Sequence, residues 1–425
     1  MLSINKIYCW LFVFALLIQI PSIHLLKFLD ELLVVFMMCL VFLDVVVNKQ
    51  FKKYNMLWLV TGIMLFYAIY SLTWVSYNTS KAIFQDFVVQ MKPFCYFCVS
   101  YAVVPQFSKN MKVVIKWICL FNVFMVVFCF IAGLTKSIFH IVTYYGLVSM
   151  ISALAYLFCS VDNNNKVSKK DIIVVVIMLL IGLISTRSKY YGEFVVALYL
   201  LFFYAPGLMK NIKLKHVLVL ALMLIVVLVV AWGKIDYYFI SGGQEYQMFD
   251  EDMLASFARP VLYAGMFMLL GLHPLFGSGL ASFATFASTT AVNYSRVYAT
   301  IGIDNVWGLS EDFDLFICDA FYPELAQFGI VGVVLFICFF VWMNKKISLL
   351  LYTSGKMLYA IGIASIVVLL IESIASTTFN QGAGALCMMV LGCLASKNKN
   401  ITKQQETEIR KMPYKERSAL EYIKK

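Results

Sequence analysis

The chain has 425 residues, of which 62% are hydrophobic, 16% aromatic and 13% charged. A water-soluble protein with this balance would expose too much apolar surface to stay monodisperse, so the composition indicates a polytopic membrane protein. The formal net charge of +11 does not indicate nucleic-acid binding. No soluble domain rich in basic and aromatic residues carries that charge; it lies in short segments between apolar runs.

Apolar runs long enough to cross a hydrocarbon core about 30 Å thick recur along the chain. They predict an all-α, single transmembrane domain over residues 1–395, followed by a charged cytoplasmic tail over residues 396–425. The twelve predicted spans are 8–26, 31–47, 56–76, 82–104, 113–134, 138–160, 171–186, 191–206, 215–232, 321–343, 357–375 and 382–395. The fourth of these carries several polar groups and the last is short.

Lysines concentrate in alternate connecting segments, including those of Lys52, Lys112 and Lys345. Because an excess of Lys and Arg marks cytoplasmic loops, this pattern places both termini in the cytoplasm. It places a large loop, residues 233–320, on the outer side. The first apolar run lacks a small-residue cleavage site, so we expect an uncleaved first helix and not a signal peptide.

The outer loop contains an apolar segment, residues 260–272, that is too short to span a membrane. Its length favours a re-entrant or interfacial helix. The sequence HPLFGSG follows directly, and its Pro274 cannot continue a helix, whereas Gly277 and Gly279 permit tight backbone turns. We interpret this stretch as a turn that positions the preceding segment, and His273 as more structural than catalytic.

Cationic residues on the outer side are notable because the orientation rule disfavours them there. They include Arg187, Lys189, Arg259 and Arg296. An arginine presents a planar fork of donors that matches phosphate oxygens, so several such groups converging on an outer cavity would suit a diphosphate. The alternative is that Arg187 and Lys189 reach toward the membrane surface and pair with Glu193 or with the acidic loop.

Other polar and sulfur-containing residues receive a structural interpretation. Cys95 and Cys98 form a C-x-x-C pattern inside an apolar run, where buried small hydrophobes are expected. No cluster has the spacing of a metal site, and no cofactor is expected. Asp44, Asp86 and Glu372 lie close to the ends of predicted spans, where we expect their carboxylates to reach water.

Three segments occur in an order that resembles the bacterial O-antigen polymerase and O-antigen ligase superfamily. They are LISTRSKYYGE (183–193), ARPVLYAGMFMLLGLHPLFGSGLASF (258–283) and DAFYPELAQFGIVGVVLF (319–336). The first resembles an arginine-bearing motif of the family, the second an arginine-led segment that ends in a Pro-x-x-Gly-x-Gly turn, and the third the entry into the helix after the large loop. Together they span roughly the C-terminal three-fifths of the chain.

The resemblance implies an integral-membrane glycosyltransferase of the GT-C type. Its substrates would be oligosaccharides carried on undecaprenyl diphosphate at the outer face of the bacterial cytoplasmic membrane, and a chain-length regulator is a further conceivable partner. By analogy, Arg187 and Arg259 would bind the diphosphate and stabilise the leaving group. We expect Lys189, Tyr191, Arg296 and His273 to complete the substrate site.

This chain departs from the resemblance at one position. Family ligases often have a histidine where the third segment begins, and this chain has Asp319 there. If the acceptor hydroxyl needs a base, Asp319 or Glu324 is the candidate, although Asp319 would serve equally well as a helix N-cap or in a loop salt bridge. The missing histidine favours a polymerase over a ligase.

Two alternatives to the polymerase stay open. A ligase would transfer the glycan to a lipid A core, and a flippase would move lipid-linked sugar across the membrane without forming a bond. A transporter needs polar groups along a pathway at the membrane midplane. In this chain the middle of most predicted spans is apolar and the polar residues gather outside, which favours the transferase.

Overall fold

A computed structural model describes residues 3–19, 29–133, 144–162, 165–205, 258–353 and 355–397. Within these ranges the regular structure is entirely helical, as predicted. Three helical stretches are long and apolar enough to cross a membrane, namely Phe51–Val75, Lys109–Ile131 and Tyr322–Tyr352. The protein is therefore helical and suited to a membrane, whereas the full set of twelve spans stays a prediction.

Several predicted features lie outside the described residues. The span 215–232 and the first part of the outer loop, 233–257, are outside them entirely. The same holds for the tail after residue 397. The spans 138–160 and 191–206 are described only from residue 144 and up to residue 205, respectively.

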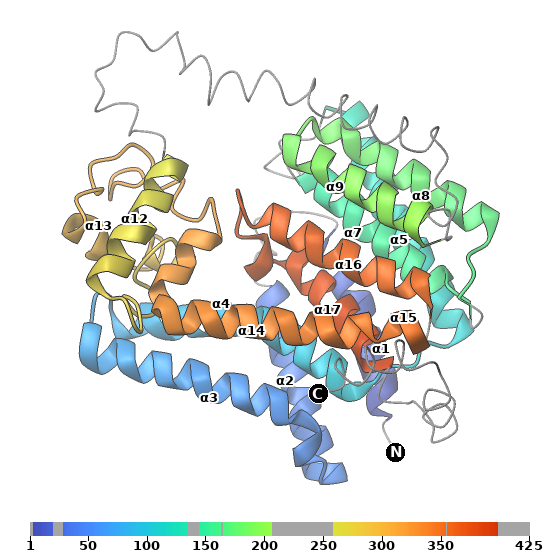
Figure 1. The fold of residues 1–425 in the computed structure, drawn as a ribbon, viewed down its shortest axis with the longest axis horizontal. Coiled ribbons are helices and arrows are strands. Elements are labelled where there is room, and N and C mark those ends of the chain that lie inside the picture. Colours follow the sequence, from blue (N-terminus) through green and yellow to red (C-terminus); the bar gives the residue numbers. More distant parts are fainter. Residues whose placement is uncertain are drawn as a thin grey trace, which may run out of the picture.

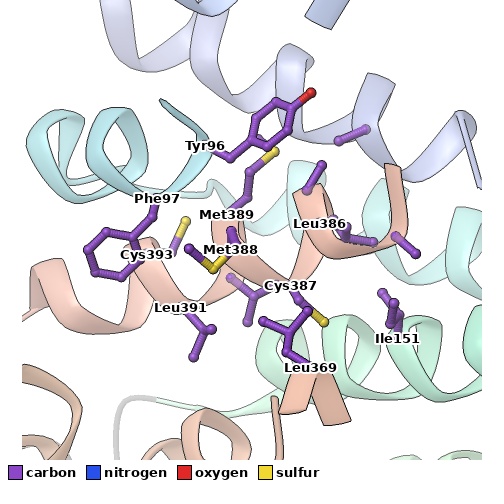
Figure 2. Packing of buried hydrophobic residues seen from close by; sticks show 14 of the residues in the cluster. Tyr96, Phe97, Ile151, Leu369, Leu386, Cys387, Met388, Met389, Leu391 and Cys393 are labelled. Atoms are coloured by element: carbon purple, nitrogen blue, oxygen red, sulfur yellow. The ribbon is translucent and has the colours of Figure 1, made fainter. Parts of the chain in front are cut away.

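The centre of the bundle is α17 (Gly382–Ser396), which is buried along nearly its whole length. It lies against α4 (Ser80–Val103), and Gly392 permits this close approach. A Cβ at Gly392 would come within 2.6 Å of the Phe97 carbonyl oxygen. Small residues commonly let membrane helices approach in this way. Figure 2 shows α17 side chains such as Met388 packed among neighbouring helices.

The other helices surround α17 and α4 in two groups. Helices α1, α7, α14 and α16 contact α17, and their bounds are Ile4–Leu17, Tyr144–Ser160, Gly329–Ser348 and Lys356–Glu372. Helix α2 (Leu29–Asn48) packs on α1 and α4, helices α5 (Lys109–Ile131) and α8 (Lys169–Gly182) pack on α7, and α9 (Ser188–Leu198) packs on α16. Between α14 and α16 lies the short α15 (Leu350–Thr353).

Helix α3 (Asn55–Tyr70) is the most peripheral of the long helices. It continues the short helix η2 (Phe51–Tyr54), ends in a wider helical turn, η3 (Ser71–Val75), and packs mainly on α4. In Figure 1 the axes of α3, α4 and α14 are roughly aligned, with the segment containing α12 at one end; the chain runs toward that end in α3 and away from it in α4 and α14. Lys52 and Lys345 lie near the opposite end of α3 and α14, as their positions in the chain require.

That end segment forms a cap, which we define as residues 258–328. It contains α12 (Ala258–Leu272), η9 (Phe286–Ser288), α13 (Val297–Thr300) and η10 (Tyr322–Phe328). Helix α12 runs across the direction of α3 and α14 (Figure 1). The cap has an apolar core of its own, centred on Leu262, Phe283 and Tyr298. It is thus a folded unit at the end of the bundle.

Polar contacts fasten the cap to the loop between α3 and α4. The Asn78 side-chain amide donates to the carbonyl oxygens of Ala281 at 2.7 Å and Asn293 at 2.9 Å. The Asn293 amide donates back to Asn78 Oδ1 at 2.8 Å. Because these partners are more than 200 residues apart in sequence, the contacts fix the tertiary position of the cap.

Candidate functional site

The structure confirms the predicted turn after α12, both its position and the requirement for glycine at two of its residues. Helix α12 ends at Leu272, and Gly277 and Gly279 have φ angles of +74° and +82°. The Gly279 backbone N–H donates to Gln327 O at 2.9 Å. A Cβ at Gly277 would lie 2.3 Å from the carbonyl oxygen of Ala326. The turn is therefore locked against η10, and it fixes how the two ends of the cap meet.

Arg259 and Asp319, two of the predicted site residues, form an ion pair. Arg259 lies in the first turn of α12, and Asp319 lies just before η10. The two side chains are 43% and 26% exposed, whereas the paired atoms, Arg259 Nε and Asp319 Oδ2, are buried against each other, so the pair lies at the edge of the cap. The structure thus brings a fixed cation and a carboxylate together from the two ends of the described cap.

Lys189 lies on α9 and pairs with the buried Glu372 at the end of α16. Its Nζ also lies 3.4 Å from Ser376 Oγ. The sequence offers Glu193 as one possible partner of Lys189. Glu193 is buried beside this pair and close enough for electrostatic interaction with both groups, but the ion pair itself is made with Glu372.

The cap and α9 meet the same turn of α16. The Tyr263 hydroxyl of α12 donates to Ile374 O at 2.8 Å, and the Tyr322 hydroxyl of η10 donates to Leu370 O at 2.7 Å. Lys189 reaches Glu372, which lies between these two acceptors in sequence. The Arg259–Asp319 pair and the Lys189–Glu372 pair therefore flank one structural junction.

Arg187 stands at the N-cap position of α9 and is partly exposed. Within the described ranges it forms no ion pair. Its carbonyl oxygen accepts from the backbone N–H of Tyr191, another predicted substrate-binding residue, at 3.3 Å. Both residues thus belong to the first turn of α9, close in sequence to Lys189.

Glu324 occupies a different environment from Asp319. It is 1% exposed, and its two carboxylate oxygens each accept from Asn380 Nδ2 at 3.1 Å. It also accepts from Gln90 Nε2. A sealed carboxylate with these donors cannot touch a substrate without rearrangement, so the geometry favours Asp319 over Glu324 as a group that meets an acceptor.

His273 and Arg296 lie on the side of the cap that faces the α3–α4 loop. The Tyr77 hydroxyl and His273 Nε2 are 2.9 Å apart. Partial burial lowers the pKa of His273 from its usual 6.5, so the ring is neutral at pH 7. Arg296 has an exposed side chain, and its backbone N–H lies 3.4 Å from Tyr77 O. Neither residue is next to the Arg259–Asp319 pair in the hydrogen-bond network.

The expectation that Asp44, Asp86 and Glu372 reach water is wrong. Their exposed fractions are at most 2%. Asp44 accepts from Lys53 and Tyr54, each at 2.7 Å, and Glu372 pairs with Lys189. Each carboxylate finds its donors inside the protein because other elements fold over the end of the helix that carries it.

Asp86 belongs to a buried network that sequence reasoning missed. It accepts from the backbone N–H of Ala281 at 2.7 Å and from the hydroxyl of Thr285. Gln90 donates to Asp86 at 3.3 Å and also to Glu324, so one amide bridges the two carboxyl groups. The signal available in the sequence is the spacing of Asp86 and Gln90, which places both on one face of α4.

The C-x-x-C cysteines behave as expected. Cys95 and Cys98 are buried, and they are not joined in a disulfide. Cys318, in the cap, forms no disulfide with the described cysteines.

The fold and this site define a class: a helical membrane protein with a folded cap at one end of the bundle and cationic groups where the cap meets the bundle. In comparisons with known proteins, no family model and no curated protein matches the chain.

Proposed function

We propose that the protein is a surface-polysaccharide polymerase of the O-antigen type. It would transfer a growing glycan from undecaprenyl diphosphate to the next lipid-linked repeat unit, at the outer face of a bacterial cytoplasmic membrane. The observation that carries this proposal is the ion pair between the partly exposed side chains of Arg259 and Asp319. These residues come from two of the three segments that resemble the polymerase and ligase superfamily.

In this proposal the ion pair is the resting form of the site. The diphosphate of the donor substrate binds the Arg259 guanidinium in place of Asp319, because phosphate oxygens match the fork of N–H donors on arginine. Asp319 then loses its partner and becomes available as a base. The acceptor hydroxyl oxygen bonds to the anomeric carbon of the donor, and the bond from that carbon to the diphosphate oxygen breaks. The electron pair leaves with the diphosphate, and the hydroxyl proton passes to Asp319.

The remaining cations have supporting roles in this scheme. Arg187 lies at the start of α9 and forms no ion pair within the described residues, so it is free to bind the diphosphate with Arg259. Lys189 is already neutralised by Glu372 and would position the α9 end against α16. Tyr191, His273 and Arg296 would border the path of the glycan.

The proposal also includes a placement in the membrane. It retains twelve spans, both termini in the cytoplasm and the cap outside. The described helices support a membrane protein, and Lys345 and Lys346 in the last turn of α14 lie at the end of that helix remote from the cap. Because lysines mark the cytoplasmic side, this arrangement favours an outer location for the cap.

Elongation of a purified lipid-linked repeat unit by the purified protein tests the proposal. Released undecaprenyl diphosphate and a ladder of longer glycans are expected. If the Arg187→Ala and Arg259→Ala variants both elongated the glycan at the wild-type rate, the assignment of these residues to the site would be wrong. Transfer only to a lipid A core would identify a ligase, and sugar movement across proteoliposomes without bond formation would identify a flippase.

A further inference from the structure

An apolar groove lies between α3, α4 and α14. It has a volume of about 430 Å³, and its walls include Val60, Ile63, Phe94 and Phe339. A second hollow of about 440 Å³, lined by Gly62, Ile63 and Leu335, adjoins it between α3 and α14. A Cβ at Gly62 would meet no atom within 4 Å. Helices α3 and α14 thus flank an open apolar gap, and burying hydrocarbon there is favourable.

Aromatic rings close the groove at the end near the cap. Phe321 and Phe379 have ring centroids 4.8 Å apart, and Phe336 lies 5.5 Å from Phe379. Gln90 also lines this end, but its amide already donates to Asp86 and Glu324. The cap end therefore offers no free charge to a headgroup in the groove.

The opposite end of the groove adjoins a polar hollow. This hollow has a volume of about 370 Å³ and shares Met56 and Leu59 with the groove. Its walls also contain Lys52, Lys53 and Asn55. Lys53 is neutralised by Asp44 at 2.7 Å. Lys52 is exposed and, among residues that the structure describes, has no ion-pair partner.

We propose that this groove binds an anionic phospholipid from the leaflet at the lysine-rich end. The lipid phosphate would contact Lys52 and Asn55, and an acyl chain would fill the gap between α3 and α14. A free phosphate leaves the apolar groove empty, and a neutral lipid leaves Lys52 unpaired, so charge and volume together select this occupant. The inference is independent of the proposed transferase activity.

The bound lipid would complete the packing of α3. This helix contacts mainly α4, and many of its apolar side chains, such as Leu59, remain exposed. A chain held between α3 and α14 would supply the missing neighbours, because dispersion contacts accumulate along the whole groove. The lipid therefore acts as a structural ligand, and its loss should loosen α3 first.

Native mass spectrometry of the full chain, released from nanodiscs of phosphatidylglycerol and phosphatidylcholine, tests the proposal. Wild type should retain phosphatidylglycerol about fivefold more than phosphatidylcholine, the selectivity that one lysine near a headgroup provides. Lys52→Gln should abolish this preference, whereas Lys109→Gln, an exposed lysine of α5, should keep it.

A second pair of variants tests the apolar part. Ile63→Trp should fill the groove and reduce retained lipid of either type, whereas Leu65→Trp, on the same helix but outside both hollows, should not. Equal retention by these two variants, or an unchanged preference in Lys52→Gln, would overturn the proposal. Displacement of the phospholipid by undecaprenyl diphosphate would also overturn it, because the groove would then belong to the donor.

Discussion

Arg259, at the start of α12, forms an ion pair with Asp319, just before η10, and the pair closes the two ends of the described cap onto each other. The two side chains are partly exposed, unlike the carboxylates of Asp86, Glu324 and Glu372. Exposed pairs contribute little to stability, typically about 0–1 kcal/mol. The pair is therefore expected to matter more for the proposed binding of a diphosphate than for the free energy of unfolding.

The first prediction separates these two roles. Arg259→Ala should lower elongation about a hundredfold, the effect of removing one donor that stabilises a developing charge. It should change the free energy of unfolding by less than about 1 kcal/mol. Lys81→Ala, which removes an exposed cation at the start of α4, is the matched control and should keep both properties. Parallel kinetics and thermal unfolding measure them.

The second prediction concerns the turn after α12. Gly277→Val should destabilise the cap by about 3 kcal/mol or more, because its φ is positive and the Cβ would overlap Ala326 O. Gly271→Val, in the preceding helix with open space around its Cβ, should cost less than about 1 kcal/mol. Limited proteolysis and thermal unfolding check the difference. Equal stability of the two variants would show that the turn tolerates a side chain.

The third prediction is a pH dependence from His273. Its pKa in the folded protein lies below the usual 6.5, so the unfolded chain binds the proton more tightly. Its contribution to stability is complete above about pH 6.5 and declines as the pH falls toward the folded pKa. His273→Asn should remove this part of the acid sensitivity while retaining substantial elongation activity. Unfolding of both proteins between pH 5 and 8 measures it; identical pH profiles would contradict the assignment.

The fourth prediction concerns the network under the cap. Gln90→Leu should cost about 3 kcal/mol, because Asp86 and Glu324 both lose a buried donor. Phe84→Leu, at an exposed position of the same helix, should be nearly neutral. Hydrogen exchange should show faster opening of residues 281–288 in Gln90→Leu. Unchanged exchange there would mean that Gln90 does not hold the cap on α4.

Part of this architecture could be predicted from the sequence. Apolar runs predicted the helical membrane character, and the run before HPLFGSG predicted α12 and its turn, because Pro274 and the two glycines act locally. The sequence also indicated Arg259 as a candidate diphosphate-binding residue and Asp319 as a candidate base. A loop salt bridge was one of the roles open to Asp319, but the sequence did not identify Arg259 as its partner, since their contact depends on how the two ends of the cap meet.

The buried polar groups were harder to predict for a physical reason. Hydropathy places an acid near the end of a span in water, as it did for Asp86 and Glu372. In the structure a distant element supplies the donors: the cap covers Asp86, and Lys189 of α9 reaches Glu372. Such pairs link residues about 180–230 positions apart, which no local pattern reveals.

Transfer of glycan by the purified protein tests the central claim most directly. Undecaprenyl-diphosphate-linked repeat units are incubated with wild type, Arg259→Ala and Lys81→Ala, and glycan length and released undecaprenyl diphosphate are measured. We predict a ladder of products for wild type and Lys81→Ala and almost none for Arg259→Ala. Equal ladders for all three proteins would contradict the site, and the absence of any glycosidic bond formation by active wild-type protein would contradict the proposed function.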